Sequence, residues 1–321
     1  MKCVRGSAFV LGLFLAWVPA AWAQDDALTP TDVLEAGQFS ATARLQFLSG
    51  QGDLRNDPVL ELDLEEQTFE AILGIALGLG AGFEVELSIP YRFRGTLQGD
   101  GEFLGASLET EDESLGFGDL QISPVYRLLK EDAAAPQLIV GAIAVAPTGN
   151  DKRGDAEIEL GGVPISDGEE GGVGQGVWKF GALAGISKRL GLVEPYVLVS
   201  YVWGGERERN DVDEERADVT TVLAGAEWHL SPAARLDTRA IFLLVGEDVT
   251  EESGQEAIEE SHFRFGFQAS LYAHLGGGFT LILGGGVLFI EDHTLDKVDQ
   301  EDLEKAFQWN LGVGLHFLFG R

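Results

Sequence analysis

The chain has 321 residues, of which 45% are hydrophobic, 53 are acidic and 22 are basic, so its formal net charge is −31. This charge excludes nucleic acid as a natural partner, because phosphate binding requires positive charge. The hydrophobic content excludes a disordered acidic protein, since disorder accompanies low hydrophobicity. The acidic and the apolar residues must therefore lie in different parts of the folded protein.

The first 23 residues have the three parts of a secretory signal peptide. Lys2 and Arg5 form a basic start, an apolar core runs from 8 to 18, and Ala21-Trp-Ala23 is a small-x-small cleavage site. The apolar core is shorter than the roughly 18 residues that a membrane-spanning helix needs. Cys3 is the single cysteine and leaves with this segment. The sequence thus predicts an exported protein without disulfides.

After the signal peptide, apolar and polar residues alternate with a period of two, which is the signature of β-strands. The pattern is clearest in 83–94, where aromatic and aliphatic residues occupy every odd position. Most of the candidate strands have the roughly 9–11 residues that a tilted strand needs to cross a bilayer. Twelve strands are predicted, at 38–48, 67–79, 83–96, 118–129, 137–147, 175–188, 194–204, 218–230, 235–246, 261–274, 279–290 and 304–319.

The connections between these strands alternate between short and long, and most of the 53 acidic residues lie in the long ones. The long connections are predicted at 49–66, 97–117, 148–174, 205–217, 247–260 and 291–303. A soluble β-sandwich has no reason to place every long loop at one end, whereas an even-stranded barrel with periplasmic termini does. The sequence therefore predicts an all-β fold: a single 12-stranded antiparallel transmembrane β-barrel of outer-membrane type at 38–321, with short periplasmic turns and long acidic extracellular loops. A periplasmic N-terminal segment, 24–37, would precede the barrel.

One stretch of the chain resembles a known family. The segment Gly116-Phe-Gly-Asp-Leu-Gln-Ile-Ser-Pro-Val-Tyr-Arg-Leu-Leu129, followed by Ala146-Pro-Thr-Gly-Asn150, is similar to the outer-membrane transporters of the MetA-pathway of phenol degradation. The resemblance implies an outer-membrane barrel for the uptake of aromatic or other hydrophobic compounds. The chain departs from such barrels at its end, where Phe319 is followed by Gly320 and Arg321 instead of closing the chain.

The row of residues opposite the apolar one is predicted to face the barrel interior, and it contains charges of both signs. Buried charges must be paired or remain hydrated, so they either interlock as a filled core or line a water path. Twelve strands lie between the number that side chains can fill and the number that holds an open channel. We favour a narrow, partly occluded pore, in which Tyr196 and Tyr272 are candidates for contact with a solute. The predicted lumen residues are Arg44, Glu84, Glu86, Arg92, Arg94, Arg127, Lys179, Tyr196, Glu227, Arg239, Arg264, Tyr272 and His316.

The acidic loops raise the question of a metal site, because clustered carboxylates bind divalent cations. Asp211, Asp213 and Glu215 are weak candidates, but no segment matches a defined calcium loop. The simpler interpretation is a solvated rim that bridges anionic lipopolysaccharide through divalent cations. We expect no specific metal and no cofactor; the expected partners are outer-membrane lipid, lipopolysaccharide, the barrel-assembly machinery and a small-molecule solute.

The function predicted from these features is passive uptake of small molecules across the outer membrane of a Gram-negative bacterium. The alternative is a non-transporting surface barrel or adhesin with cation-binding acidic loops. An outer-membrane lipid hydrolase is least favoured, because that chemistry needs a paired serine and histidine. The sequence contains no Gly-x-Ser-x-Gly motif, and its histidines fall on predicted lumen rows, apart from His293, which is expected in a loop. We therefore expect a protein that is not an enzyme.

Overall fold

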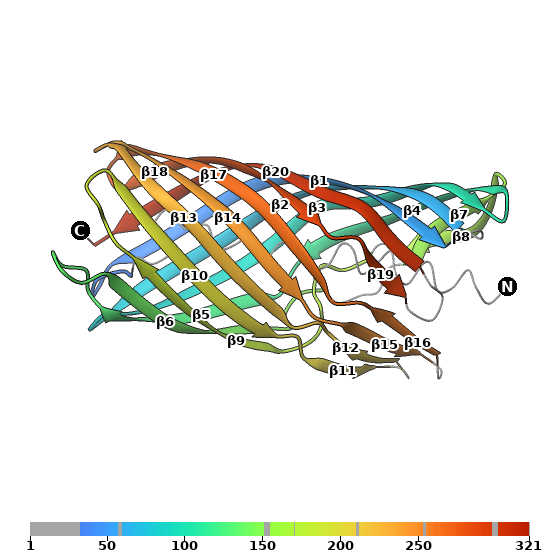
Figure 1. Ribbon diagram of the computed structural model, residues 1–321, viewed down its shortest axis with the longest axis horizontal. Coiled ribbons are helices and arrows are strands. Elements are labelled where there is room, and N and C mark those ends of the chain that lie inside the picture. The colour runs from blue at the N-terminus through green and yellow to red at the C-terminus, as the bar shows by residue number, and fades with distance from the viewer. Residues whose placement is uncertain are drawn as a thin grey trace.

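Twelve antiparallel strands form a closed barrel in the computed structural model, which describes residues 33–56, 60–150, 155–169, 171–209, 212–252, 255–296 and 301–320 (Figure 1). The pairing of β1 with β20 closes the ring. None of the described residues forms a helix that is long and apolar enough to cross a membrane. The barrel strands are β1 (Phe39–Asn56), β2 (Leu60–Gly80), β3 (Phe83–Phe103), β5 (Leu120–Leu129), β6 (Gln137–Ala146), β9 (Lys179–Ser187), β10 (Val193–Trp203), β13 (Val219–Ser231), β14 (Ala234–Val245), β17 (His262–Gly276), β18 (Phe279–Ile290) and β20 (Glu301–Phe319). The predicted 12-stranded antiparallel barrel is confirmed.

The turns at one end of the barrel are tight. β2 and β3 are joined through Ala81 and Gly82, whose φ angles are 53° and 78°, and glycine favours such left-handed conformations because it has no Cβ. Both ends of the described barrel lie here, since Phe39 at the start of β1 pairs with Phe319 at the end of β20. We call this the short-turn end.

At the opposite end, the connections predicted as long loops are largely β-structure in the described residues. β1 and β2 continue to the pair Asn56–Leu60, and β3 continues to Phe103. Four further strands extend this sheet: β4 (Ala106–Phe117), β7 (Asp155–Leu160), β8 (Val163–Glu169) and β19 (His293–Asp296). Another four form a separate sheet: β11 (Glu206–Arg209), β12 (Val212–Glu215), β15 (Asp248–Glu252) and β16 (Gln255–Glu259). We call these eight strands and the adjoining barrel-strand ends the extension.

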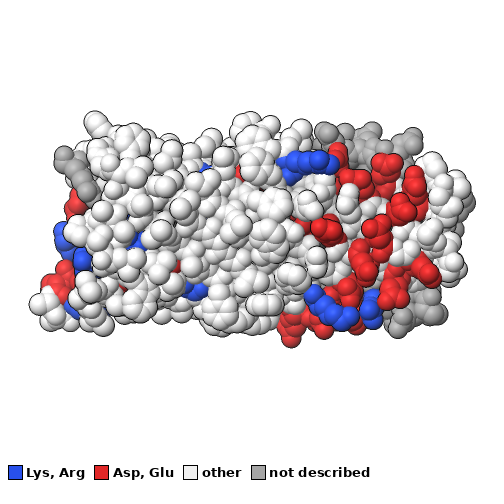
Figure 2. All heavy atoms as spheres, turned by 90° about the horizontal axis from the view of Figure 1, so that it is seen from above, with Lys and Arg blue, Asp and Glu red and all other residues white. Residues whose placement is uncertain are grey.

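The acidic residues of the extension alternate with leucines, and they therefore belong to strands and not to loops. In β2, the segment Leu60-Glu-Leu-Asp-Leu64 has buried leucines and exposed carboxylates. The outward row of β2 therefore changes from acidic, at Glu61 and Asp63, to apolar from Phe69 onward. Figure 2 shows the result: carboxylates gather at one end of the molecule, and most of the remaining visible surface is uncharged.

The inward row of the extension is apolar and forms a buried cluster. This cluster, the extension core, consists of Leu54, Leu60, Leu62, Leu64, Leu97, Leu108, Ile158, Ile290, Leu303 and Ala306. Going along β2 toward the short-turn end, the inward row becomes polar at Glu66, before the outward row becomes apolar. Within a few residues of β2, the inward face thus changes from apolar to polar and the outward face changes from acidic to apolar. This change is expected where a sheet passes from water into hydrocarbon.

The residues before β1 fold against the inward surface of the barrel at the short-turn end. Leu34 is buried, and its backbone N–H donates to Glu84 Oε2 at 2.5 Å. Glu35 forms ion pairs with Arg127 at 3.0 Å and with Lys130 at 3.1 Å. The hydrogen bonds from Lys130 and Arg127 lower the pKa of Glu35. Two of the predicted lumen residues, Glu84 and Arg127, therefore bind the segment that precedes β1.

Gly78 provides the space for this arrangement, since a Cβ at Gly78 would lie 2.1 Å from the Glu35 carbonyl oxygen. We predict that Gly78→Ala displaces residues 33–37 and destabilises the folded barrel by about 1–3 kcal/mol, the usual range for overpacking. Chemical denaturation in detergent would measure this loss. Gly74→Ala is the matched control, because its added Cβ would meet nothing closer than 3.8 Å. Equal stability of the two variants would contradict the prediction.

Candidate functional site

The interior of the barrel has a polar wall formed by β20, β1, β2 and β3. Gln308 Nε2 donates to Glu66 Oε2 at 2.6 Å, and Gln46 donates to Glu70 on the neighbouring strand. Buried Arg92 donates to Ser114 Oγ at 2.9 Å. The side chains of this wall are almost completely buried, which requires the hydrogen bonds and opposite charges that they find there.

The facing wall is largely apolar, whereas the predicted lumen residues are polar. Inward-facing residues of β5, β6, β9, β10, β13 and β14, here called the apolar wall, form most of a large apolar cluster that also includes Val33, Leu48 of β1 and Leu288 of β18. On β14 the change occurs within one row, where Ile241 and Leu243 follow Asp237 and Arg239. In 240–245 both faces of the strand are apolar, so the inward direction of Ile241 follows only from continuing the alternation that starts at Asp237 and Arg239. The members of the wall on these strands are Val125, Ile139, Ile143, Leu183, Leu198, Val219, Leu223, Ile241, Leu243 and Val245.

A polar network lies on the same side of the barrel, nearer the short-turn end. Tyr196 donates its hydroxyl to Asp237 Oδ1 at 2.8 Å, and Arg239 Nε donates to Asp237 Oδ2 at 2.9 Å. Next to it, the Arg235 guanidinium lies 5.2 Å from the centre of the Tyr272 ring. Both tyrosines point inward, as the alternation indicated, and each is almost fully buried beside these charged groups.

Most of the predicted lumen residues lie on the inward rows. Glu86, Arg127 and Arg264 are partly exposed there. The buried ones are Arg44, Glu84, Arg92, Lys179, Tyr196, Glu227, Arg239, Tyr272 and His316. The structure brings Arg44 and Arg92 to the polar wall and Tyr196, Glu227, Arg239 and Tyr272 to the opposite side, so the predicted set does not form one site.

Arg94 is the exception, and its predicted place in the lumen is wrong. Glu70 pairs with Arg92 but Phe69 pairs with Arg94, so Phe93 is an extra residue in β3. Such a β-bulge shifts the alternation by one residue. The Arg94 side chain is therefore 69% exposed and forms an ion pair with Glu113 at 3.2 Å. Leu97 points inward for the same reason and is completely buried.

The bulge predicts a difference between two arginines that are two residues apart. A thiol at Arg94→Cys should react with a membrane-impermeant maleimide about tenfold faster than one at Arg92→Cys, because thiol reactivity follows exposure. Labelling rates on the folded protein in detergent would measure this difference. A variant with Cys3 replaced serves as the cysteine-free background. Faster labelling at position 92 would show that β3 continues without a bulge.

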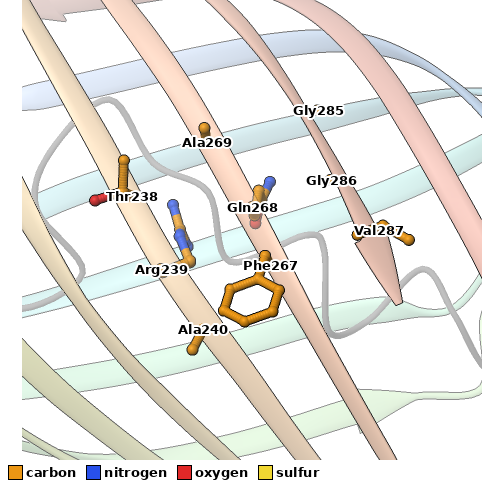
Figure 3. Close-up of a pocket in the computed structure, with 9 residues that line it drawn as sticks. All are labelled: Thr238, Arg239, Ala240, Phe267, Gln268, Ala269, Gly285, Gly286 and Val287. Atoms are coloured by element: carbon orange, nitrogen blue, oxygen red, sulfur yellow. The ribbon is translucent and has the colours of Figure 1, made fainter. Parts of the chain in front are cut away.

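A cavity of about 520 Å³ lies outside the lumen. Figure 3 shows the residues that line it on three neighbouring strands, β14, β17 and β18. Arg239 and Gln268 form the inward row, whereas Phe267 is half exposed on the outward row. The cavity is thus a groove in the outer surface, above small residues such as Ala269 and Gly285.

The structure describes two of the three weak metal candidates. Asp211 lies outside the described residues. Asp213 and Glu215 lie on β12, in the separate four-stranded sheet, and not in the irregular loop that was expected. Close by in that sheet, burial raises the pKa of Asp248 to about 6, against the opposing effect of Arg216.

The described residues contain two other groups with metal-ligating side chains close together. One consists of Glu259, His262 and His293, and the other of Glu194, Glu227 and His229. The sequence did not indicate either group, because each includes one member that is distant in sequence from the other two. His293, which was expected in a loop, is a buried residue of the short strand β19.

Comparison with known proteins establishes the fold. No family model matches the chain, and no curated protein matches it. The solved structure of the COG4313 outer membrane channel from Pseudomonas putida F1 is similar, with a TM-score of 0.62 and 14% identity over 92% of this chain and 100% of that one. The transport unit of the autotransporter AIDA-I from Escherichia coli gives 0.55 and 12%, over 96% and 97% of the two chains. At these identities the likeness concerns the fold of an outer-membrane β-barrel, and membership of the phenol-degradation family stays a prediction.

Proposed function

We propose that this protein is an outer-membrane channel for the passive uptake of small molecules that have an apolar body and a polar group. The observation that carries the proposal is the pair of unlike walls inside the barrel. Buried polar groups such as Arg92 and Glu70 lie on one side, and aliphatic side chains such as Leu198 and Leu223 lie on the other.

A path between such walls suits an amphipathic solute better than a sugar. Small-molecule sites are mostly apolar, with a few polar groups that fix the orientation of the ligand. A small aromatic acid or alcohol would place its ring on the apolar wall and its oxygen on the polar wall. The similar Pseudomonas putida structure is described as a channel, which supports the same class of function, and the sequence resemblance to phenol-degradation transporters supports an aromatic solute.

The acidic outer surface fits a location in the outer membrane of a Gram-negative bacterium, in contact with lipopolysaccharide. Three carboxylates face each other directly across neighbouring strands, since Asp63 pairs with Asp100 and Asp100 pairs with Glu109. Like charges in direct register destabilise a sheet, so we propose that divalent cations neutralise this surface and bridge it to anionic lipid. Insertion through the barrel-assembly machinery belongs to the same proposal.

The channel proposal predicts ion current and solute entry. The refolded chain in planar bilayers should conduct, with a preference for cations at low ionic strength that fades as salt screens the acidic rim. Liposomes containing it should admit benzyl alcohol or benzoate faster than a sugar. Heat-modifiable electrophoretic mobility verifies folding; folded protein that passes neither ions nor solutes would refute the channel.

The contribution of the apolar wall can be tested separately. Ile241→Asn should lower the entry of benzyl alcohol several-fold relative to glycerol, because an amide on this wall weakens apolar contact and introduces a polar group to desolvate. Ile241→Val is the control, since it keeps the wall apolar. If both variants transport aromatic solutes like the unchanged protein, the wall does not select the solute.

A non-transporting surface protein or adhesin is the second candidate. It is favoured by apolar residues at the tips of the extension, where Leu104 is 70% exposed and Val163 is 63% exposed. Replacing both with serine would abolish cell adhesion under this alternative and would leave solute entry unchanged under the channel proposal. That the chain is not an enzyme stays a prediction, which a phospholipid hydrolysis assay would test.

A further inference from the structure

The extension brings together three metal-ligating side chains from three different strands. Glu259 ends β16, His262 begins β17 and His293 begins β19. One ligand atom of each lies within 4.8 Å of the other two. We infer that Glu259, His262 and His293 form a binding site for a divalent transition-metal ion at the end of the barrel opposite the short turns.

The distances between the side chains suit such an ion. Glu259 Oε1 lies 3.2 Å from His293 Nε2 and 3.6 Å from His262 Nδ1. Two ligands that bind a tetrahedral zinc ion at about 2.0–2.1 Å are about 3.3 Å from each other. The carboxylate therefore already stands at ligand spacing from both rings.

A backbone hydrogen bond fixes the ring of His293 in an orientation and a tautomer that suit metal coordination. The Nδ1 atom of His293 lies 2.8 Å from the carbonyl oxygen of Glu291. Because a carbonyl only accepts, Nδ1 carries the hydrogen, and in the neutral ring Nε2 presents its lone pair to Glu259. Metal-bound histidines usually have this outer hydrogen bond. The Glu260 N–H donates to the Thr294 carbonyl at 2.8 Å, which holds the two chain segments together.

Because the side chains of Glu259, His262 and His293 are buried, a cation between their ligand atoms would stabilise them. The side chains of His262 and His293 are 0% and 4% exposed, and that of Glu259 is 13% exposed. A lone pair and a carboxylate that face each other away from water repel each other unless a proton or a metal ion lies between them. The acidic surface of the extension adds a potential that attracts cations.

His262 also connects the site to the lumen. Its ring stacks on that of His293 with centroids 3.8 Å apart, and its Nε2 accepts a hydrogen bond from Arg264 Nε at 2.8 Å. In this arrangement Nδ1 carries the hydrogen, which it donates to the Glu260 carbonyl oxygen at 3.1 Å. If Nδ1 instead binds a metal, the neutral ring loses this hydrogen bond and carries its hydrogen on Nε2, where it would meet the N–H of Arg264. Metal binding therefore requires the two rings to turn apart and Arg264 to leave, so the ion competes with a lumen arginine.

The donor set selects the class of ion. Two imidazole nitrogens and one carboxylate suit Zn²⁺, Ni²⁺ or Cu²⁺, whereas Ca²⁺ and Mg²⁺ prefer oxygen ligands. Three protein ligands leave a further coordination position for water, which is the arrangement of an exchangeable site and not of a closed structural one.

The second group of similar residues serves as an internal control. In it, Glu227 lies 3.0 Å from Arg235 and 3.1 Å from His229. A guanidinium that is already paired with the carboxylate occupies the place of a metal ion. We therefore expect no metal binding there.

The test is titration of the folded full chain, without a polyhistidine tag, with ZnCl₂ in a calorimeter. We expect one saturable site, and Glu259→Gln and His293→Asn should each weaken it by tenfold or more. Arg264→Met should tighten it, because this variant removes the competing donor and its charge. His229→Asn should leave the affinity unchanged.

A spectroscopic measurement keeps the proposal testable even if a variant fails to fold. With one equivalent of Cu²⁺, the electron paramagnetic resonance spectrum of the unchanged chain should show coupling to imidazole nitrogen. No saturable zinc binding, no nitrogen coupling, or zinc binding that survives both Glu259→Gln and His293→Asn in folded protein would each overturn the site. These measurements do not depend on whether the barrel transports a solute.

Discussion

The architecture depends on the pairing between β1 and β20, which runs from Phe39–Phe319 into the extension. Inside hydrocarbon no water can satisfy an unpaired N–H or C=O group, so a sheet can cross a membrane only if it has no free edge. Closing the ring satisfies this requirement for all twelve strands at once. It also creates the enclosed interior in which Arg92, Glu70 and the other buried polar side chains can lie.

Once the ring is closed, each face of a strand must match the medium beside it. Strand β2 shows this along its length: its outward row is acidic at Glu61 and apolar from Phe69, while its inward row is apolar at Leu62 and polar from Glu66 to Glu70. The extension is therefore folded like a water-soluble protein, with leucines inside and carboxylates outside, whereas the membrane part has an apolar outer surface around an interior with both polar and apolar walls. The same continuous strands serve both parts, so the acidic end is held as an ordered surface.

The proposed solute path and the inferred metal site lie next to each other where the extension joins the membrane part of the barrel. Arg264 lies on an inward row of the barrel and binds His262, whose neighbours Glu259 and His293 belong to the extension. An ion bound there would release a positive charge toward the lumen. The proposed solute path, between the polar wall and the apolar wall, begins at the level where the extension core gives way to polar side chains.

The sequence by itself determined the number of barrel strands, the end at which the tight turns lie and the side of the molecule that carries the acid. These features follow from a period of two and from turn residues such as Ala81-Gly82, and both are local. The tertiary structure alone decided the rest. The bulge at Phe93 reverses the alternation and turns Arg94 outward. Closure of the barrel, and not the alternation, packs Ile241 into one cluster with apolar residues of other strands. The group of Glu259, His262 and His293 could not be predicted either, because His293 is distant in sequence and reaches the other two only through the contact between β16 and β19.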